Sequence, residues 1–381
     1  MKFIHTADWH LGKLVHNISM TEDQAYILNQ LTTILKEEKP DCLVIAGDLY
    51  DRPIPPVAAV ELLDEFFAKI NIELNIPILA ISGNHDSAQR LSFGSKWYKK
   101  NQLHMVTDIT QCFEPVEING VHYYLVPYCE PAYARQVFDD STIHSHQDVF
   151  TYVISNIKEK MNPDVPNVLV AHAFVLGGKE TDSERLLSVG GSSCVTNQTF
   201  DGFDYVALGH LHSPDAIKHD KVFYSGSLLK YSFSEVNQKK SVQLVQFNED
   251  KSFELTYFPL IPRRDMRELK GEFKTLLAPE FVETQKTDDY IKVVLTDDGA
   301  LIDPMNTLKN IYPNILHLEK ERSMKDLKEK EKLSSKTAQK RSEQDLFKQF
   351  FLDITTAEYT EEKEKEMMKV IQLAKKEELE R

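Results

Sequence analysis

Histidine, aspartate and asparagine occur in five short segments of this chain, and each segment directly follows a short apolar run. The segments are Asp8-Trp9-His10, Gly47-Asp48, Gly83-Asn84-His85-Asp86, Ala171-His172-Ala173 and Gly209-His210-Leu211-His212. The apolar runs before them cover residues 3–4, 43–46, 78–81, 168–171 and 205–208, and are typical of buried β-strands. Side chains at such strand ends meet at one edge of an α/β sheet, so the pattern predicts one shared site.

The side chains that these segments supply are suited to metal binding. The candidate ligands are Asp8, His10, Asp48, Asn84, His172, His210 and His212. Oxygen and imidazole donors without thiolates suit hard or borderline divalent ions such as manganese, iron(II) or zinc. On an extended segment, residues two apart point the same way, so Asp8 and His10 could bind one ion together. His210 and His212 could do the same if their turn stays extended.

The number of donors indicates two ions rather than one. The Asp48 carboxylate has two oxygens and could bridge both ions. Two ions about 3.5–4 Å apart can stabilise the attacking and leaving oxygens of a phosphoryl displacement. Any single segment could instead be an ordinary turn or a structural histidine. All five occur in order after apolar strands, which favours a dinuclear phosphoesterase.

Further segments carry a resemblance to a known family. They are Ser183-Glu184-Arg185, Val189-Gly190-Gly191, Tyr224-Ser225-Gly226-Ser227 and the stretch from Lys230 to Glu235. With the five segments above, they make the chain resemble the calcineurin-like metallophosphoesterases, and among these the nuclease subunits of bacterial ATPase–nuclease complexes. The resemblance extends strongly over residues 1–260. It implies an α/β fold, a two-sheet sandwich flanked by helices, followed by a small α+β capping domain and a C-terminal helical pair.

The resemblance also implies a reaction and a set of roles. One ion would bind at Asp8, His10, Asp48 and His212, and the other at Asp48, Asn84, His172 and His210. His85 would protonate or hydrogen-bond the leaving oxygen, and the Asp51 carboxylate would hold the His85 imidazole. The resemblance implies exonuclease and endonuclease cleavage of DNA, with manganese as the metal. For Asp51 an ordinary polar turn remains open, and Glu184 and Arg185 are candidate substrate-side residues.

Composition limits the class of protein. The chain has 381 residues, of which 41% are hydrophobic and 27% charged, as in soluble globular proteins. No apolar run reaches the length of a membrane span, and the N-terminal residues are expected to form a strand rather than a signal peptide. Four cysteines without paired spacing predict reduced thiols and a cytoplasmic protein. A net charge of −14 predicts weak DNA binding by this chain alone, with a partner supplying affinity.

The chain is expected to divide into four parts. Residues 1–260 would form the nuclease domain, 261–320 a capping domain that contacts DNA, 321–342 a linker, and 343–381 a helical partner-binding segment. Helices are expected at 21–38 with Thr21 as N-cap, at 57–70, 87–100, 147–161 and 267–277, and from Asp303 to 311. Strands are expected at 121–128, 289–296 and 315–318, and at 222–225 and 241–247, which would complete the second sheet. His144-Ser145-His146 is expected to be a surface loop.

Two surfaces have more than one interpretation. Helices 57–70 and 87–100 carry aromatic and basic side chains, which fit either a solvated face or, by resemblance, a homodimer surface. Near the C-terminus, Leu346, Phe347, Phe350 and Phe351 share one helical face, and a second apolar face follows from about residue 361. These faces either pack on the body or bind a partner. The resemblance favours the coiled-coil base of an ATPase.

Two other functions stay open at this stage. The chain could be another phosphoesterase of the same fold, or a non-catalytic scaffold. The linker and helical tail argue against the first, and the complete set of donors with His85 argues against the second.

We expect truncation after Lys340 to leave a folded, metal-loaded and dimeric protein, because the candidate ligands all precede residue 213. The truncated chain should cut simple DNA substrates with manganese but lose binding to its ATPase. Charged residues at Phe347 and Phe350 should reproduce this loss, because burying a charge in an apolar groove is unfavourable. A pull-down beside a thermal melt checks both variants. A lowered melting temperature with intact ATPase binding would show that the helices pack on the body instead.

Overall fold

The computed structural model describes residues 1–184, 194–297 and 301–321, together with residues 348, 360, 363, 364 and 366–368. Two compact units are present, one comprising Met1–Val294 with Asp303–Glu319 and the other comprising Leu295–Ile302 with Lys320–Arg381. The expected partner-binding residues, Leu346, Phe347, Phe350 and Phe351, lie outside the described residues, as does nearly all of the expected linker.

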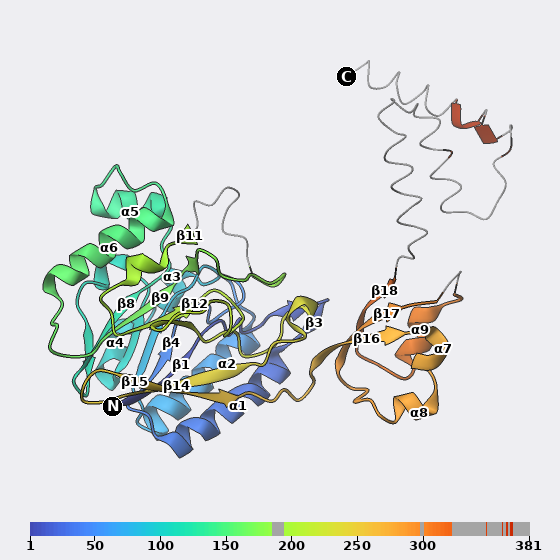
Figure 1. Cartoon of the computed structure of the whole chain (residues 1–381), viewed down its shortest axis with the longest axis horizontal. Helices are drawn as coiled ribbons and strands as arrows, with labels where there is room; N and C mark the ends of the chain where they lie inside the picture. Colours follow the sequence, from blue (N-terminus) through green and yellow to red (C-terminus); the bar gives the residue numbers. More distant parts are fainter. Residues whose placement is uncertain are drawn as a thin grey trace. The chain divides into compact units, whose positions relative to one another are not determined.

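Two sheets form the body of the first unit (Figure 1). The first sheet has the order β15 (Phe253–Pro259), β14 (Ser241–Phe247), β1 (Lys2–Thr6), β4 (Cys42–Ile45), β5 (Ile78–Ile81) and β6 (Leu103–Val106). The second has the order β13 (Val222–Tyr224), β12 (Tyr205–Gly209), β9 (Asn167–His172), β8 (Val121–Val126) and β7 (Val116–Ile118). In the first sheet β1, β4, β5 and β6 run parallel to one another, and in the second sheet β13, β12, β9 and β8 do the same. The strands β14, β15 and β7 pair antiparallel with their neighbours.

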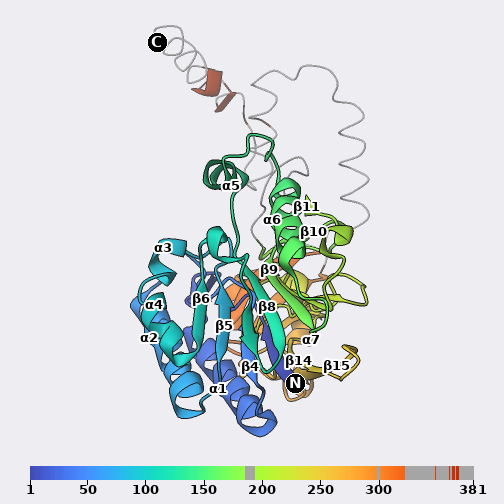
Figure 2. The same ribbon diagram turned by 90° about the vertical axis from the view of Figure 1, so that its left-hand side faces the viewer.

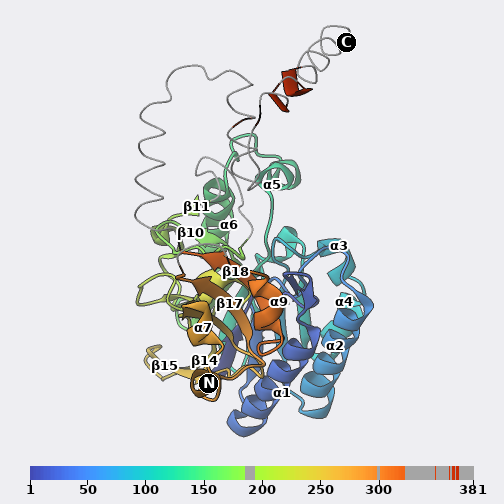
Figure 3. The ribbon, with the colours of Figure 1, turned by 90° about the vertical axis from the view of Figure 1, so that its right-hand side faces the viewer.

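Apolar side chains fill the space between the sheets and beneath the helices. Phe3, Val44 and Leu79 of the first sheet belong to one buried cluster with Val170 and Tyr205 of the second. Strands that are covered on both faces have continuous apolar sequences, which is the pattern by which the sequence analysis predicted them. Helices α1 (Thr21–Glu38) and α2 (Val57–Phe67) cover the outer face of the first sheet, and α6 (His146–Lys160) covers the second (Figures 2 and 3).

Several local predictions were wrong. Residues 241–247 do form a strand, but it joins the first sheet beside β1 rather than the second. The expected helix at 267–277 is strand β16 (Met266–Gly271) followed by the short helix α7 (Phe273–Leu276). The buried residues Met266 and Leu269 have helical spacing, but pairing with the neighbouring strand β17 (Tyr290–Leu295) determines the conformation.

Several helix boundaries also differ from expectation. Thr21 is the first residue of α1, and Met20 occupies the N-cap position without a side-chain hydrogen bond. The expected helix at 87–100 is two short helices, α3 (Ala88–Leu91) and α4 (Ser95–Tyr98), because Gly94 between them has a φ of +78°. Ser145 is the N-cap of α6 and forms a capping box with Asp148, so the expected surface loop ends there and His146 is buried.

A small α+β element follows the second sheet. Strands β16, β17 and β18 (Ile315–Lys320) form one sheet with the helices α7, α8 (Pro279–Val282) and α9 (Pro304–Lys309). Its first residues are bound to α1 through Asp23, whose side chain is fully buried. The Asp23 carboxylate accepts hydrogen bonds from Arg264 Nε at 3.0 Å, Arg264 Nη2 at 2.7 Å and the Tyr290 hydroxyl at 2.7 Å.

None of the helices in the described part of the chain combines the length and the hydropathy needed to cross a lipid bilayer.

A buried polar group lies between the two sheets. His5 on β1 is fully buried, with Nε2 3.2 Å from the Leu208 carbonyl oxygen and Nδ1 3.1 Å from Gln243 Oε1. Burial lowers the pKa of His5 to about 4, although the hydrogen bonds to Gln243 and Leu208 oppose this shift. The folded protein therefore binds fewer protons than the unfolded chain between about pH 6.5 and about pH 4.

We expect His5 to lower the free energy of unfolding as the pH decreases over this range. The sign follows from the lowered pKa, because protons bind the unfolded state first as the pH decreases. Between pH 7.5 and pH 5 the wild-type protein should lose about 2 kcal/mol more than His5→Gln. Urea denaturation of both proteins at the two pH values measures this difference. Equal losses would show that His5 does not contribute.

Candidate metal centre

Five strand ends bring the candidate ligands together at one edge of the two sheets. Asp8 and His10 follow β1, Asp48 follows β4 and Asn84 follows β5. From the second sheet, His172 ends β9, and His210 and His212 follow β12. All these side chains are buried except that of Asn84, which is partly buried. The structure thus places all seven predicted ligands around one centre.

The Asp48 carboxylate lies between two groups of nitrogen donors. Asp48 Oδ2 is 3.6 Å from His10 Nε2 and 3.5 Å from His172 Nε2. Its other oxygen, Oδ1, accepts a hydrogen bond of 2.8 Å from the His85 main-chain N–H. One oxygen is therefore shared between the two groups, which is the position that a bridging ligand requires.

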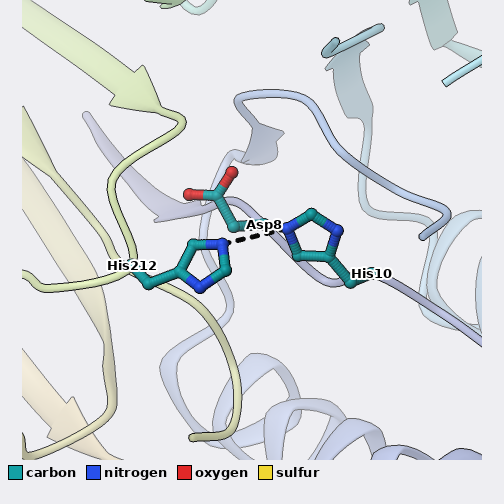
Figure 4. A group of neighbouring side chains, drawn as sticks. All are labelled: Asp8, His10 and His212. Atoms are coloured by element: carbon teal, nitrogen blue, oxygen red, sulfur yellow. Dashed lines mark hydrogen bonds between the residues drawn. The ribbon is translucent and has the colours of Figure 1, made fainter. Parts of the chain in front are cut away.

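The first group consists of Asp8, His10 and His212, whose donor atoms lie within 4.8 Å of one another (Figure 4). His10 Nε2 and His212 Nε2 are 3.0 Å apart. In the second group, Asn84 Oδ1 lies 2.9 Å from His172 Nε2 and 3.2 Å from His210 Nδ1. His172 Nδ1 donates to the Ala46 carbonyl oxygen at 2.9 Å, so its unprotonated Nε2 is directed at Asn84 and Asp48.

The electrostatics of the centre suit cations. Burial and the Lys13 ammonium group hold the pKa of His10 well below its ordinary value, and burial and His172 do the same to His210. The imidazoles are therefore neutral and offer lone pairs. Burial and the Asp48 charge raise the pKa of Asp8 well above its usual range. Divalent ions would reverse this repulsion, so the chemistry of the donors fits a pair of them.

The backbone that carries the ligands is not extended, contrary to the premise of the sequence analysis. Asp8, His10 and Asp48 have φ angles of 53°, 47° and 52°, in the left-handed region that non-glycine residues rarely adopt. Two hydrogen bonds between the loops hold this conformation, from Asp8 N–H to the Gly47 carbonyl at 3.1 Å and from His10 N–H to the Asp48 carbonyl at 3.0 Å. Strained backbone of this kind clusters at functional sites.

Side chains that were not assigned a role in the sequence also support these loops. The Asp86 carboxylate accepts hydrogen bonds from the main-chain N–H groups of Leu49, Tyr50 and Gly83, at 3.1, 2.9 and 2.9 Å. It therefore joins the loop after β4 to the loop after β5. Gln24 of α1 donates to the His10 carbonyl at 2.8 Å and accepts from Gly12 N–H at 3.0 Å. Asp86 belongs to the Gly83-Asn84-His85-Asp86 segment that the sequence pattern identified, whereas no pattern in the sequence identifies Gln24.

The expected pairing of His85 with the Asp51 carboxylate was wrong. His85 Nδ1 lies 2.8 Å from the main-chain oxygen of Asp51, while the Asp51 carboxylate forms an ion pair of 2.8 Å with Lys13. A carbonyl oxygen only accepts, so His85 Nδ1 carries a proton, the same tautomer that a carboxylate would have imposed. The difference arises because the Lys13 ammonium group, in the loop after His10, takes the carboxylate.

The Glu184 carboxylate contacts the main chain of the candidate ligand His212. Glu184 Oε1 accepts from the His212 main-chain N–H at 2.6 Å, and burial raises the pKa of Glu184 to about 7. Arg185 lies outside the described residues. Beside this contact, Lys240 donates to the His212 carbonyl at 2.8 Å and to Glu235 Oε2 at 2.6 Å. Glu235 belongs to a segment that carries the family resemblance, but Lys240 had no signal in the sequence.

Comparisons with known proteins agree with this geometry. The family model of the calcineurin-like phosphoesterases matches residues 1–214. The chain therefore belongs to the calcineurin-like phosphoesterase family and is a metal-dependent phosphoester hydrolase. A second model, SbcD_C, described as the type 5 capsule protein repressor C-terminal domain, matches residues 262–355. The two matches together identify an SbcD-type member of the family.

Solved structures show more distant similarity. A dimetal phosphatase from Danio rerio is 11% identical, with a TM-score of 0.40, and the match covers 68% of this chain and 96% of that chain. TT1561 of Thermus thermophilus is 12% identical, with a TM-score of 0.37 and coverage of 67% and 98%. The phosphoesterase Yfce of E. coli is 14% identical, with a TM-score of 0.29 and coverage of 68% and 100%. The family assignment rests on the two family models alone.

We expect Asp48→Asn to weaken binding of both ions together, because one carboxylate oxygen lies between the two donor groups. Isothermal titration with Mn²⁺ and elemental analysis of the purified protein measure affinity and occupancy. Asp201→Asn, at an exposed position, is the matched control and should bind as the wild type does. Loss of one ion with full retention of the other would show that Asp48 is a terminal ligand.

Proposed function

We propose that the chain is a DNA nuclease that acts with an SbcC-type ATPase. It cuts duplex ends as an exonuclease and single strands or hairpins as an endonuclease, in DNA repair, replication and recombination. The observation that carries the phosphodiesterase chemistry is the Asp48 carboxylate between two donor groups. The match of the SbcD-type C-terminal model and the family resemblance support DNA as substrate, the ATPase as partner and a cytoplasmic location.

The proposed ligand sets follow the two donor groups. Asp8, His10, Asp48 and His212 hold one ion, and Asp48, Asn84, His172 and His210 hold the other, with manganese as the proposed metal. Such a pair of ions supplies charge stabilisation to the phosphoryl oxygens and orients an attacking water. The buried imidazoles and carboxylates keep the donor atoms fixed before the substrate binds, which avoids reorganisation during the reaction.

His85 is the proposed general acid. It is partly buried, unlike the histidine ligands, and its ring centroid lies 4.7 Å from that of His10. The Asp51 carbonyl oxygen fixes His85 Nδ1 as a donor. Transfer of a proton from Nε2 to the leaving oxygen therefore requires the form of His85 in which both ring nitrogens carry protons, and the pairing of Nδ1 with the carbonyl keeps the ring in one orientation.

We expect His85→Ala to keep both ions and to lower turnover 10²–10⁴-fold, as is typical for a positioned acid or base. Elemental analysis gives metal content, and cleavage of a labelled duplex with Mn²⁺ gives turnover. His144→Ala provides the control, because His144 is exposed and contacts Arg135 rather than the centre. Loss of metal from His85→Ala would place His85 among the ligands.

Substrate class is tested by comparing DNA with other phosphoesters. The Mn²⁺-loaded protein is assayed on linear duplex, hairpin and single-stranded DNA, and beside these on a phosphopeptide and a cyclic nucleotide, with and without the ATPase. Cleavage of DNA that Asp48→Asn abolishes supports the proposal. Hydrolysis of the phosphopeptide or cyclic nucleotide alone would assign the chain to another branch of the family.

A homodimer is the proposed assembly. Large apolar side chains are exposed on the helices that the sequence marked for self-association: Val57 is 72%, Phe93 75% and Trp97 68% exposed. They lie on α2, the α3–α4 connection and α4, and the rings of Phe93 and Trp97 are 6.4 Å apart. Exposed apolar side chains gathered in this way favour association. Residues 261–320 remain the proposed capping domain that contacts DNA, and residues 343–381 the proposed ATPase-binding segment.

A further inference from the structure

A chain of polar groups, consisting of the partly buried Ser183 and the buried Glu235 and Lys240, approaches His212 Nδ1 on the side of the ring away from His10. Ser183 Oγ lies 2.7 Å from His212 Nδ1 and 2.5 Å from Glu235 Oε1. Glu235 is fully buried, and its other oxygen accepts from Lys240 Nζ at 2.6 Å. The His212 imidazole thus has Nε2 beside His10 and Nδ1 beside a hydroxyl group that is backed by a buried ion pair.

The direction of each hydrogen bond follows from counting protons. The Lys240 ammonium group keeps the Glu235 carboxylate ionised, so Glu235 Oε1 can only accept. Ser183 has a single hydroxyl proton, and the short contact assigns it to Glu235. The Ser183 oxygen then accepts at its lone pairs, from His212 Nδ1–H and from the Thr181 hydroxyl at 3.1 Å. The reverse arrangement would place a Ser183 lone pair against a carboxylate oxygen 2.5 Å away.

Neighbouring contacts fix the position of Ser183 itself. Glu184 Oε1 accepts from His212 N–H at 2.6 Å, and Glu184 Oε2 accepts from Thr181 N–H at 2.5 Å. Lys240 also donates to the His212 carbonyl at 2.8 Å. The main chain and the ring of His212 are therefore held by the same short segment, and Ser183 has little freedom to turn away.

We propose that Ser183, backed by Glu235 and Lys240, is a positioning residue that holds His212 as the Nδ1–H tautomer with the Nε2 lone pair in the metal centre. The inference rests on the proposed function, because it treats His212 as a metal ligand. Outer hydrogen bonds of this type fix the tautomer and orientation of a ligating histidine, and their removal typically lowers metal affinity 10–100-fold.

The test uses the full-length protein and Mn²⁺ titration. Ser183→Ala should lower affinity about 10–100-fold at the site that contains His212 and leave the other site unchanged. Ser183→Thr, which keeps the hydroxyl group, should retain the wild-type Mn²⁺ affinity. Ser232→Ala is the matched control, because the Ser232 hydroxyl contacts the same Glu235 oxygen at 3.1 Å without touching His212. Calorimetry resolves the two affinities, and the paramagnetic resonance signal of a coupled Mn²⁺ pair reports loss of one ion.

A second readout needs no metal and no activity. In metal-free wild-type protein with ¹⁵N-labelled histidine, the His212 resonances should show a protonated Nδ1 and an unprotonated Nε2, and Ser183→Ala should shift them toward a mixture of tautomers. A wild-type His212 with Nε2 protonated would overturn the proposal even if Ser183→Ala did not fold. Equal Mn²⁺ affinities in Ser183→Ala and wild type would also overturn it.

The outcomes separate this inference from the proposed function. If the wild type binds two ions and cuts DNA, and Ser183→Ala has the same Mn²⁺ affinities, only the proposed role of Ser183 is disproved. If the wild type binds two ions but does not cut DNA, the proposed substrate is disproved. The Mn²⁺ titration of Ser183→Ala still decides the role of Ser183.

Discussion

The buried Asp48 carboxylate is the constraint on which the rest of the site depends. It is shielded from solvent beside the Asp8 carboxylate. Burial keeps the surrounding imidazoles neutral, so they do not compensate the negative charge. Buried carboxylates that repel each other are unfavourable unless cations join them. The buried carboxylates therefore favour the binding of divalent ions at the edge where five strands end. The two sheets, whose strands are mostly apolar and buried, support that arrangement.

The loops that carry the donors show how this arrangement is kept. Asp8, His10 and Asp48 occupy left-handed conformations that an isolated loop would avoid. Main-chain hydrogen bonds between the loops after β1 and β4 hold them, and the Asp86 carboxylate joins the loop after β5 to the same group. Each loop is thus fixed by its neighbours rather than by its own sequence. Substitutions that disturb one loop should consequently affect donors carried by another.

Sequence reasoning found the strands and their terminal donors because both signals are local. An apolar run followed by Asp, His or Asn needs no knowledge of distant residues. The partner of His85 could not be predicted in this way, since it depends on Lys13 reaching the Asp51 carboxylate. The strand at Met266–Gly271 was mistaken for a helix because pairing with β17 overrides its local spacing. Lys240 and Gln24 were missed because their importance comes from what they touch, and neither has a distinctive neighbour in the chain.

The first turn of α1 joins two parts of the first unit that are far apart in the sequence. Asp23 binds Arg264 and Tyr290 of the small α+β element, and the next residue, Gln24, binds the His10 carbonyl and the Gly12 N–H. The attachment of the small element and the support of the His10 carbonyl therefore rest on adjacent residues of one helical turn. Unwinding of this turn would release both sets of contacts at once, so the position of His10 and the attachment of the small element depend on the same few residues of α1.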